Sequence, residues 1–236
     1  TAYLPLTALG AASQTAGIER IEASRTLQLS MIDAVAATPV TLADPGVAGN
    51  GAGVIIGIVD SGIDATHPMF TGRIDRYWDQ TASGPGPANV NLSYGVEHVS
   101  PTTNVAPDTN GHGTHVAGIA AGSDPAAPGV ADGATLVIVK STLQNAHIAD
   151  AVRYIFETAD QLGMPAVVNL SLGGHSDPHD GTDGLSRRID KLSGPGKIVC
   201  AAAGNEGEDD IHARIVVANG STDSVEFVVP GGSPPS

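Results

Sequence analysis

Three polar side chains in this sequence stand where catalytic groups are often found. Asp60 ends the apolar run GVIIGIVD, His112 opens the helix-like stretch HGTHVAGIAAG between two glycines, and Asn205 follows the apolar run KIVCAAAG. Histidine can move a proton near neutral pH, a carboxylate can orient it, and an amide can donate hydrogen bonds to an oxygen atom. Together these residue types could serve acid–base chemistry.

Each of these residues also has an ordinary structural explanation. Asp60 could cap a helix or turn, His112 could be a packed or capping histidine, and Asn205 could be a turn residue. His112 and His115 form a His-x-x-His pair that would allow a metal site, although further spaced ligands and a carboxylate would be wanted. The glycine-ended strand exit at residues 171–174 could pair with an extended peptide or simply lead into a loop.

The sequence around these residues alternates between apolar runs and helical patterns. Apolar, strand-like runs cover residues 53–60, 136–140, 166–172 and 197–204, and helical patterns cover residues 114–121, 145–163 and 183–194. Continuous apolar runs are typical of buried parallel strands. The alternation predicts an α/β fold with a doubly wound, mainly parallel sheet flanked by helices. Ligands of such sheets bind at the carboxyl ends of the strands, where Asp60 and Asn205 fall.

The amino-acid composition argues against some classes of binding partner. The 236 residues are enough for one large α/β domain. A net charge of -14 with only 11 basic residues argues against nucleic acid or an anionic membrane as partner. No apolar run approaches the roughly 18 residues of a membrane span. The single cysteine, Cys200, lies in an apolar run and is expected to be a buried small hydrophobe.

Five motifs together resemble the subtilisin-like serine peptidases, the subtilases. They are DSGID, NGHGTHVAGIAAG, GVADGATLVIVK, VVNLSLGG and AAAGNEG, in register from about residue 50 to 208. The resemblance implies that Asp60 orients His112, that His112 is general base and then general acid, and that Asn205 donates to the oxyanion. It also implies a cleft that holds a protein or peptide substrate as an added strand, lined by Ser171, Leu172, Gly173, Ala202, Ala203 and Gly204.

One part of that resemblance is missing from the sequence. The family's nucleophilic serine should follow Asn205 in a Gly-Thr-Ser turn that opens a long helix. None of the later serines stands in such a turn: Ser221, Ser224, Ser233 and Ser236. We therefore expect a serine endopeptidase, incomplete at its C-terminus and inactive alone. The alternatives are a non-catalytic pseudoprotease that binds peptides or regulates, and a metal-dependent hydrolase that uses His112 and His115.

The resemblance also divides the chain. Residues 1–30, with a helical pattern at 4–15 and a strand-like pattern at 17–24, are expected to be the end of a propeptide or a plain N-terminal extension. Residues 31–212 are expected to be the N-terminal part of the catalytic domain. Residues 213–236 are expected to begin a β-rich segment, such as a domain inserted between Asn205 and the serine.

Cofactor, partners and location follow from the same resemblance. Calcium is common in the family, but no EF-hand spacing is present, so we expect no required cofactor and solvated loop acids at Asp124, Asp177, Asp180 and Asp183. The expected partners are a peptide substrate, the chain's own propeptide and the missing C-terminal part. The parent protein is expected to be extracellular or in the cell envelope.

Overall fold

The computed structural model of the chain describes residues 5–16, 18, 27–29, 49–206, 216–222 and 224. The chain divides into two compact units, Thr1–Gly204 and Asn205–Ser236. The helices and strands below all belong to the first unit. The predicted boundaries at residues 30–31 and 212–213 lie outside the described residues, as do most of the strands predicted at 17–24 and 213–232.

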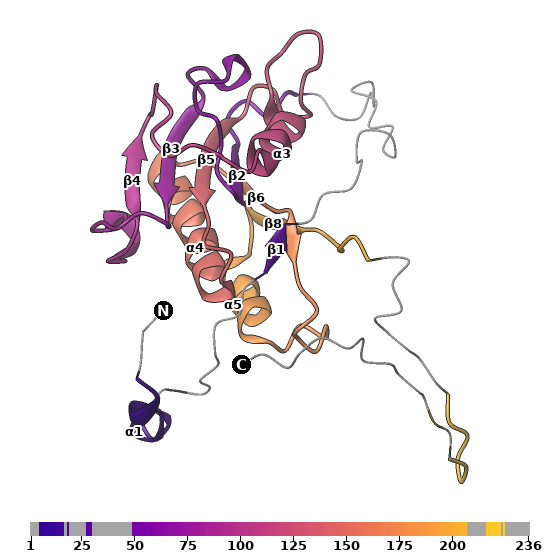
Figure 1. Cartoon of the computed structure of the whole chain (residues 1–236). Coiled ribbons are helices and arrows are strands. Elements are labelled where there is room, and N and C mark those ends of the chain that lie inside the picture. Colours follow the sequence, from indigo (N-terminus) through magenta and orange to yellow (C-terminus); the bar gives the residue numbers. More distant parts are fainter. Residues whose placement is uncertain are drawn as a thin grey trace. The chain divides into compact units, whose positions relative to one another are not determined.

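A six-stranded sheet forms the centre of the first unit (Figure 1). In spatial order its strands are β4 (Val96–Val99), β3 (Ile74–Asp79), β5 (Thr135–Lys140), β2 (Ile55–Asp60), β6 (Ala166–Leu170) and β8 (Lys197–Ala201). Only the β3–β4 pair is antiparallel, and the other four pairs are parallel. This confirms the predicted mainly parallel α/β sheet.

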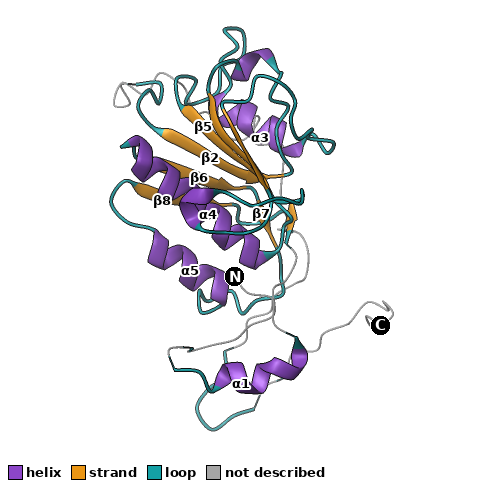
Figure 2. Ribbon diagram, turned by 90° about the vertical axis from the view of Figure 1, so that its left-hand side faces the viewer, coloured by secondary structure: helices purple, strands orange, loops and turns teal. Residues whose placement is uncertain are grey.

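Helices cover both faces of the sheet, as a doubly wound fold requires. Figure 2 shows α3 (His112–Ala121) on one face and α4 (Asn145–Leu162) and α5 (Gly184–Leu192) on the other. Each face has its own apolar core, with α4 packed in one and α3 in the other. The described residues also contain three 3-10 turns: η1 (Leu6–Ala8), η2 (Pro68–Phe70) and η3 (Ala88–Val90).

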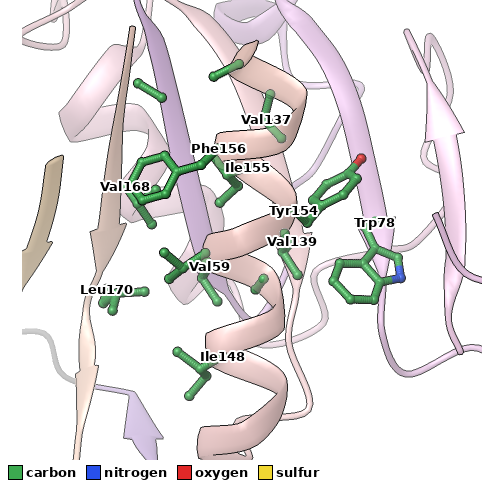
Figure 3. Packing of buried hydrophobic residues seen from close by; sticks show 14 of the residues in the cluster. Val59, Trp78, Val137, Val139, Ile148, Tyr154, Ile155, Phe156, Val168 and Leu170 are labelled. Carbon is green, nitrogen blue, oxygen red and sulfur yellow. The ribbon is translucent and has the colours of Figure 1, made fainter. Parts of the chain in front are cut away.

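The amphipathic pattern of α4 explains its place on the sheet. Ile148, Ile155 and Phe156 recur at helical spacing and are buried against Val59 and other strand residues (Figure 3). Gly57 in β2 allows this close packing, because a Cβ atom there would lie 2.6 Å from Ile155 Cγ2. The α4 contact thus holds the central strand that carries Asp60.

Two strands of the six-stranded sheet, β3 and β4, were not predicted from the sequence. β3, with the sequence IDRYWD, mixes charged and aromatic residues instead of forming a continuous apolar run. β3 lies next to the edge strand β4, where charged side chains can form ion pairs. Arg76 Nη1 lies 2.8 Å from Asp75 Oδ2, and Arg76 Nε lies 3.8 Å from Glu97 Oε1. An apolar pattern reveals central strands, but strands near an edge can keep their charges.

The expectation that Cys200 is buried is wrong. Cys200 is exposed, and Ile198, two residues earlier on the same face of β8, is 53% exposed. β8 pairs with β6 on one side and is the last strand of the sheet in the described residues. An apolar run indicates a strand that can be buried. The position of the strand in the sheet decides how much of its surface neighbouring strands and helices cover.

The N-terminal part contains shorter elements than predicted. The 3-10 turn η1 and the short helix α1 (Leu9–Ser13) replace a single helix over residues 4–15. Farther on, β1 (Gln28–Leu29) pairs antiparallel with β7 (Leu172–Gly173) in a separate two-stranded sheet. None of the described helices has the length and hydropathy that crossing a membrane requires.

Candidate active site

The end of β2 and the start of α3 bring two of the predicted site residues into contact. Asp60 is the last residue of β2 and His112 is the first residue of α3. His112 Nδ1 lies 2.7 Å from Asp60 Oδ1, although the two residues are 52 positions apart in the sequence. Asp60 is fully buried and His112 is 9% exposed. The pair therefore forms a shielded carboxylate–imidazole contact at the carboxyl edge of the sheet.

The surroundings of Asp60 affect its ionisation in opposite directions. Burial raises the pKa of the Asp60 carboxyl, and hydrogen bonds from the Ser61 N–H and from His112 partly offset this. Both of these donors contact Oδ1, and the Ser61 N–H donates over 2.7 Å. Oδ2 is buried and has no hydrogen-bond partner among the described residues. The pKa stays above its ordinary value, so the ionised carboxylate depends strongly on these two donors.

The contact with Asp60 determines how a neutral His112 can act. A carboxylate accepts from Nδ1–H, so the neutral ring keeps its proton on Nδ1 and presents a lone pair at Nε2. His112 Nε2 is buried and has no hydrogen-bond partner within the described part of the chain. That nitrogen can accept a proton from a hydroxyl group, which is the chemistry of a general base.

Gly113 permits the close approach of helix and strand. A Cβ atom on Gly113 would lie 2.1 Å from the carbonyl oxygen of Gly62 and 3.1 Å from Asp60 Oδ1. Real Cβ atoms do not approach a carbonyl oxygen so closely, so a larger residue would push the helix away from the strand. The glycine after His112 is thus needed for the 2.7 Å contact between His112 and Asp60.

A peptide-like strand already lies beside the predicted cleft residues. Gln28 pairs with Gly173 and Leu29 with Leu172 in the antiparallel β1–β7 ladder. On the other side, the Leu27 N–H donates to the carbonyl oxygen of Leu143 over 2.7 Å. The Leu27 side chain is 7% exposed and belongs to the core cluster on the α4 side. Residues 27–29, which include β1, are therefore held by backbone hydrogen bonds on two sides.

The register places this strand near the Asp60 end of the sheet. β2 and β6 run parallel with Ile58 opposite Asn169, so two residues later Ser171 is level with Asp60. The Ser171 hydroxyl accepts a hydrogen bond from Asn169 Nδ2 over 2.8 Å, and β7 follows at once. Ser171, Leu172 and Gly173 thus leave the sheet on the same edge as the Asp60–His112 pair.

The remaining predicted residues follow β8. The Ala202 N–H donates to Leu170 O over 3.0 Å, and Ala203 and Gly204 continue the chain to the end of the first unit. Asn205 begins the second unit, where its backbone N–H donates to Glu206 Oε2 over 2.7 Å. The oxyanion role of Asn205 and the pocket role of residues 202–204 stay predictions.

The acidic loop residues hold turns and a helix end. Asp124 accepts from the Ala126 N–H, and Asp180 accepts from the backbone N–H and the hydroxyl of Thr182. The expectation that Asp183 is a solvated loop acid is wrong: it is 8% exposed, because it caps α5 by accepting from the Ser186 N–H. Across residues 49–206 and the other described segments, no three His, Cys, Asp or Glu side chains form a group that could hold a metal ion.

Two residues near the pair were not singled out from the sequence. Leu143 contributes a backbone carbonyl to the strand contact, and no side-chain pattern could reveal that. Asp108, in the loop PDTNG before α3, makes several hydrogen bonds around His112, described below. The Asp and Asn residues of that loop are typical of turns in which the side chain accepts backbone hydrogen bonds, and this pattern could have indicated Asp108.

Comparison with known proteins identifies relatives of this chain. Residues 51–231 match the model of the subtilase family. Thermitase of Thermoactinomyces vulgaris is 32% identical over 165 residues, which are 66% of this chain and 49% of thermitase. The extracellular serine proteinase of Thermus sp. (strain Rt41A) is 31% identical over 187 residues, covering 75% of this chain and 38% of that protein. The chain thus spans half or less of the length of these relatives.

Among solved structures, the CspB protease of Clostridium perfringens is similar to this chain. Its TM-score is 0.59 at 26% sequence identity, and the match covers 67% of this chain and 38% of that one. The two chains are therefore similar in fold as well as in sequence.

Proposed function

The chain belongs to the subtilase family, and from this we propose that it carries the Asp–His part of a serine endopeptidase that hydrolyses peptide bonds. The observation that carries the proposal is the 2.7 Å contact between His112 Nδ1 and Asp60 Oδ1, with a buried and unpartnered Nε2 on the same ring. A ring held in this way is ready to accept a proton at one defined nitrogen.

In the proposed reaction a serine hydroxyl approaches His112 Nε2. Its proton passes to that nitrogen while the oxygen attacks the carbonyl carbon of the substrate, and Asp60 stabilises the imidazolium. We assign Asn205 as a donor to the oxyanion that develops on the carbonyl oxygen. His112 then returns the proton to the leaving amine, and water repeats the sequence to release the acyl group as an acid.

We infer that the nucleophile of this reaction is not among the 236 residues, since no serine after Asn205 stands in a Gly-Thr-Ser turn. We therefore expect the chain alone not to hydrolyse a peptide. A form of the protein that carries a serine in such a turn should hydrolyse it, react with a fluorophosphonate probe, and lose both properties in His112→Ala.

Two outcomes would contradict this proposal. Hydrolysis by the 236-residue chain itself, abolished by His112→Ala, would place the nucleophile inside it. A natural form that binds peptides but neither hydrolyses them nor reacts with the probe would instead support the non-catalytic pseudoprotease.

We further propose that residues 27–29 hold the place of a peptide substrate, as the end of the chain's own propeptide. The support is the strand's pairing with β7 and the hydrogen bond from Leu27 to Leu143. Adding a strand in this way supplies affinity through backbone hydrogen bonds and selectivity through side-chain pockets. An apolar side chain at the position of Leu27 would then be preferred in a substrate. The Thermus relative is an extracellular serine proteinase, and this supports an exported parent protein.

Leu27→Asp should free the cleft for an added peptide. Loss of a buried leucine removes roughly 1.5–3 kcal/mol of apolar burial, which corresponds to at least about a tenfold change in an equilibrium constant. A synthetic peptide with the sequence of residues 24–31 should therefore bind Leu27→Asp about tenfold more tightly than the unchanged chain, measured by calorimetry.

Ile18→Asp is the matched control for this experiment, because Ile18 is 41% exposed in the same N-terminal segment. It should leave the affinity for the peptide unchanged. Equal affinities of Leu27→Asp and the unchanged chain would contradict the proposed occupancy of the cleft.

A further inference from the structure

The carboxylate of Asp108 connects the end of β2 to the loop before α3. Its Oδ1 accepts a hydrogen bond from the Ser61 hydroxyl over 2.8 Å. The same oxygen accepts from the backbone N–H of Gly111 over 3.0 Å and of Asn110 over 3.3 Å. Ser61 directly follows Asp60, and Gly111 directly precedes His112. One oxygen atom therefore contacts the chain next to both members of the catalytic pair.

The second oxygen of Asp108 holds the first turn of α3. Oδ2 accepts from the Thr114 backbone N–H over 2.9 Å and from the Thr114 hydroxyl over 2.7 Å. The Gly113 N–H donates to the Ser61 hydroxyl oxygen over 2.9 Å, so Ser61 links the helix to Asp108 a second time. With these bonds the Asp108 carboxylate accepts five hydrogen bonds from residues on both sides of the Asp60–His112 contact.

Helix α3 needs such external acceptors at its start. The first N–H groups of a helix have no partner within the helix, and the residue before α3, Gly111, has no side chain to accept from them. Loop residues accept instead: Asn110 Oδ1 from the His112 N–H, the Ser61 hydroxyl oxygen from the Gly113 N–H, and Asp108 Oδ2 from the Thr114 N–H. A carboxylate is also favoured at this end of a helix by the helix dipole.

The ionisation of Asp108 fits this arrangement. Burial raises the pKa of Asp108, but the hydrogen bonds from Thr114, Ser61 and Gly111 outweigh burial and leave the pKa below its ordinary value. A lowered pKa means that the folded state favours the charged carboxylate. The stability that it contributes is complete above the ordinary pKa of an aspartate, about 3.9, and is lost as the pH falls through the lowered value.

We propose that Asp108 is a positioning residue that fixes the start of α3 against the end of β2 and so sets the contact between His112 and Asp60. The helix start reaches the strand through Asp108 and through Ser61, which Asp108 itself orients. Without the carboxylate, Thr114 and Gly111 lose their acceptor, and the His112 ring gains freedom to move from Asp60. The catalytic consequence of this proposal rests on the proposed function, whereas the geometric consequence does not.

The test uses the 236-residue chain and nuclear magnetic resonance of its histidine rings. In the unchanged chain, the His112 ring should show one tautomer and a downfield Nδ1–H proton that exchanges slowly. Asp108→Ala should broaden or remove that proton signal and mix the tautomers while circular dichroism still shows a folded chain. Asp108→Asn keeps one acceptor oxygen and should have an intermediate effect. In a natural form that carries the serine, Asp108→Ala should lower kcat about 10²-fold, the loss expected for a misplacement of about 1 Å, with little change in KM.

Asp64→Asn is the matched control. The Asp64 carboxylate also accepts from a backbone N–H and a hydroxyl, both of Thr66. Asp64 reaches the start of α3 through its backbone N–H, which donates to the Thr114 hydroxyl over 2.9 Å and which the substitution leaves in place. It should leave the His112 signals unchanged.

Unchanged His112 signals in a folded Asp108→Ala chain would overturn the proposal. If Asp108→Ala does not fold, the milder Asp108→Asn and Thr114→Ala variants decide in the same way. Altered His112 signals in a protein that hydrolyses nothing would leave the positioning role standing and count against the proposed function alone.

Discussion

Replacing Asp60 with asparagine is expected to lower kcat for peptide hydrolysis about 10⁴-fold in a natural form of the protein that carries the serine. The Asp60 carboxylate accepts from His112 Nδ1 over 2.7 Å. An amide NH₂ group turned toward Nδ1 would require that nitrogen to accept, and the ring proton would move to Nε2. The nitrogen that must take the serine proton would then already carry one.

Steady-state kinetics with a peptide substrate measure this effect. KM should change little, because Asp60 is fully buried at the end of β2 and does not lie in β7, the strand that pairs with Gln28 and Leu29. The control is Asp183→Asn, which alters another buried carboxylate that caps α5. It should lower stability without lowering kcat. A loss below tenfold for Asp60→Asn would count against the catalytic role of the pair.

The same exchange should not lower the stability of the fold. Because burial raises the pKa of Asp60, the folded state disfavours the ionised carboxylate relative to the unfolded chain. Asp60 therefore makes the folded state less stable as the pH rises from about 3.9, the ordinary pKa of an aspartate, through the raised pKa of Asp60. Asparagine carries no charge and should have equal or greater stability at pH 7, measured by urea unfolding.

Gly113→Ala is expected to destabilise the fold by about 3 kcal/mol, at the upper end of the usual range for an added methyl group in a packed site. The new Cβ would lie 2.1 Å from Gly62 O and 3.1 Å from the Cβ of Asp60. The first of these is a backbone atom that cannot rotate away, so α3 must shift from β2. The shift should also weaken the hydrogen bond between His112 and Asp60.

Gly118→Ala in the same helix separates this clash from the general effect of the substitution. Its Cβ would meet only the flexible Met69 Sδ, at 3.3 Å. Alanine favours a helix interior by up to about 1 kcal/mol over glycine, so Gly118→Ala should be neutral or stabilising. Equal effects of the two substitutions on the midpoint of urea unfolding would contradict the proposed close approach at Gly113.

The buried parallel strands and the long helices were predictable because burial requires a continuous or periodic apolar pattern. Residues 53–60 and 166–172 have that pattern and contain β2 and β6, and residues 145–163 contain α4. The charged strand β3 escaped prediction because its polar groups are paired near the sheet edge. The exposure of Cys200 could not be predicted, because the apolar run around it does not show which strands and helices lie beside β8.

For the candidate site, too, the sequence determined some properties and the tertiary structure determined others. The sequence by itself determined the residue types, the order Asp60, His112, Asn205, and the family, because motifs of this kind are local and can be read along the chain. Only the tertiary structure decided that His112 Nδ1 and Asp60 Oδ1 lie 2.7 Å apart, that Nε2 has no hydrogen-bond partner among the described residues, and that Gln28 and Leu29 pair with β7. These contacts join segments far apart in the sequence, and their geometry depends on how the sheet and helices pack.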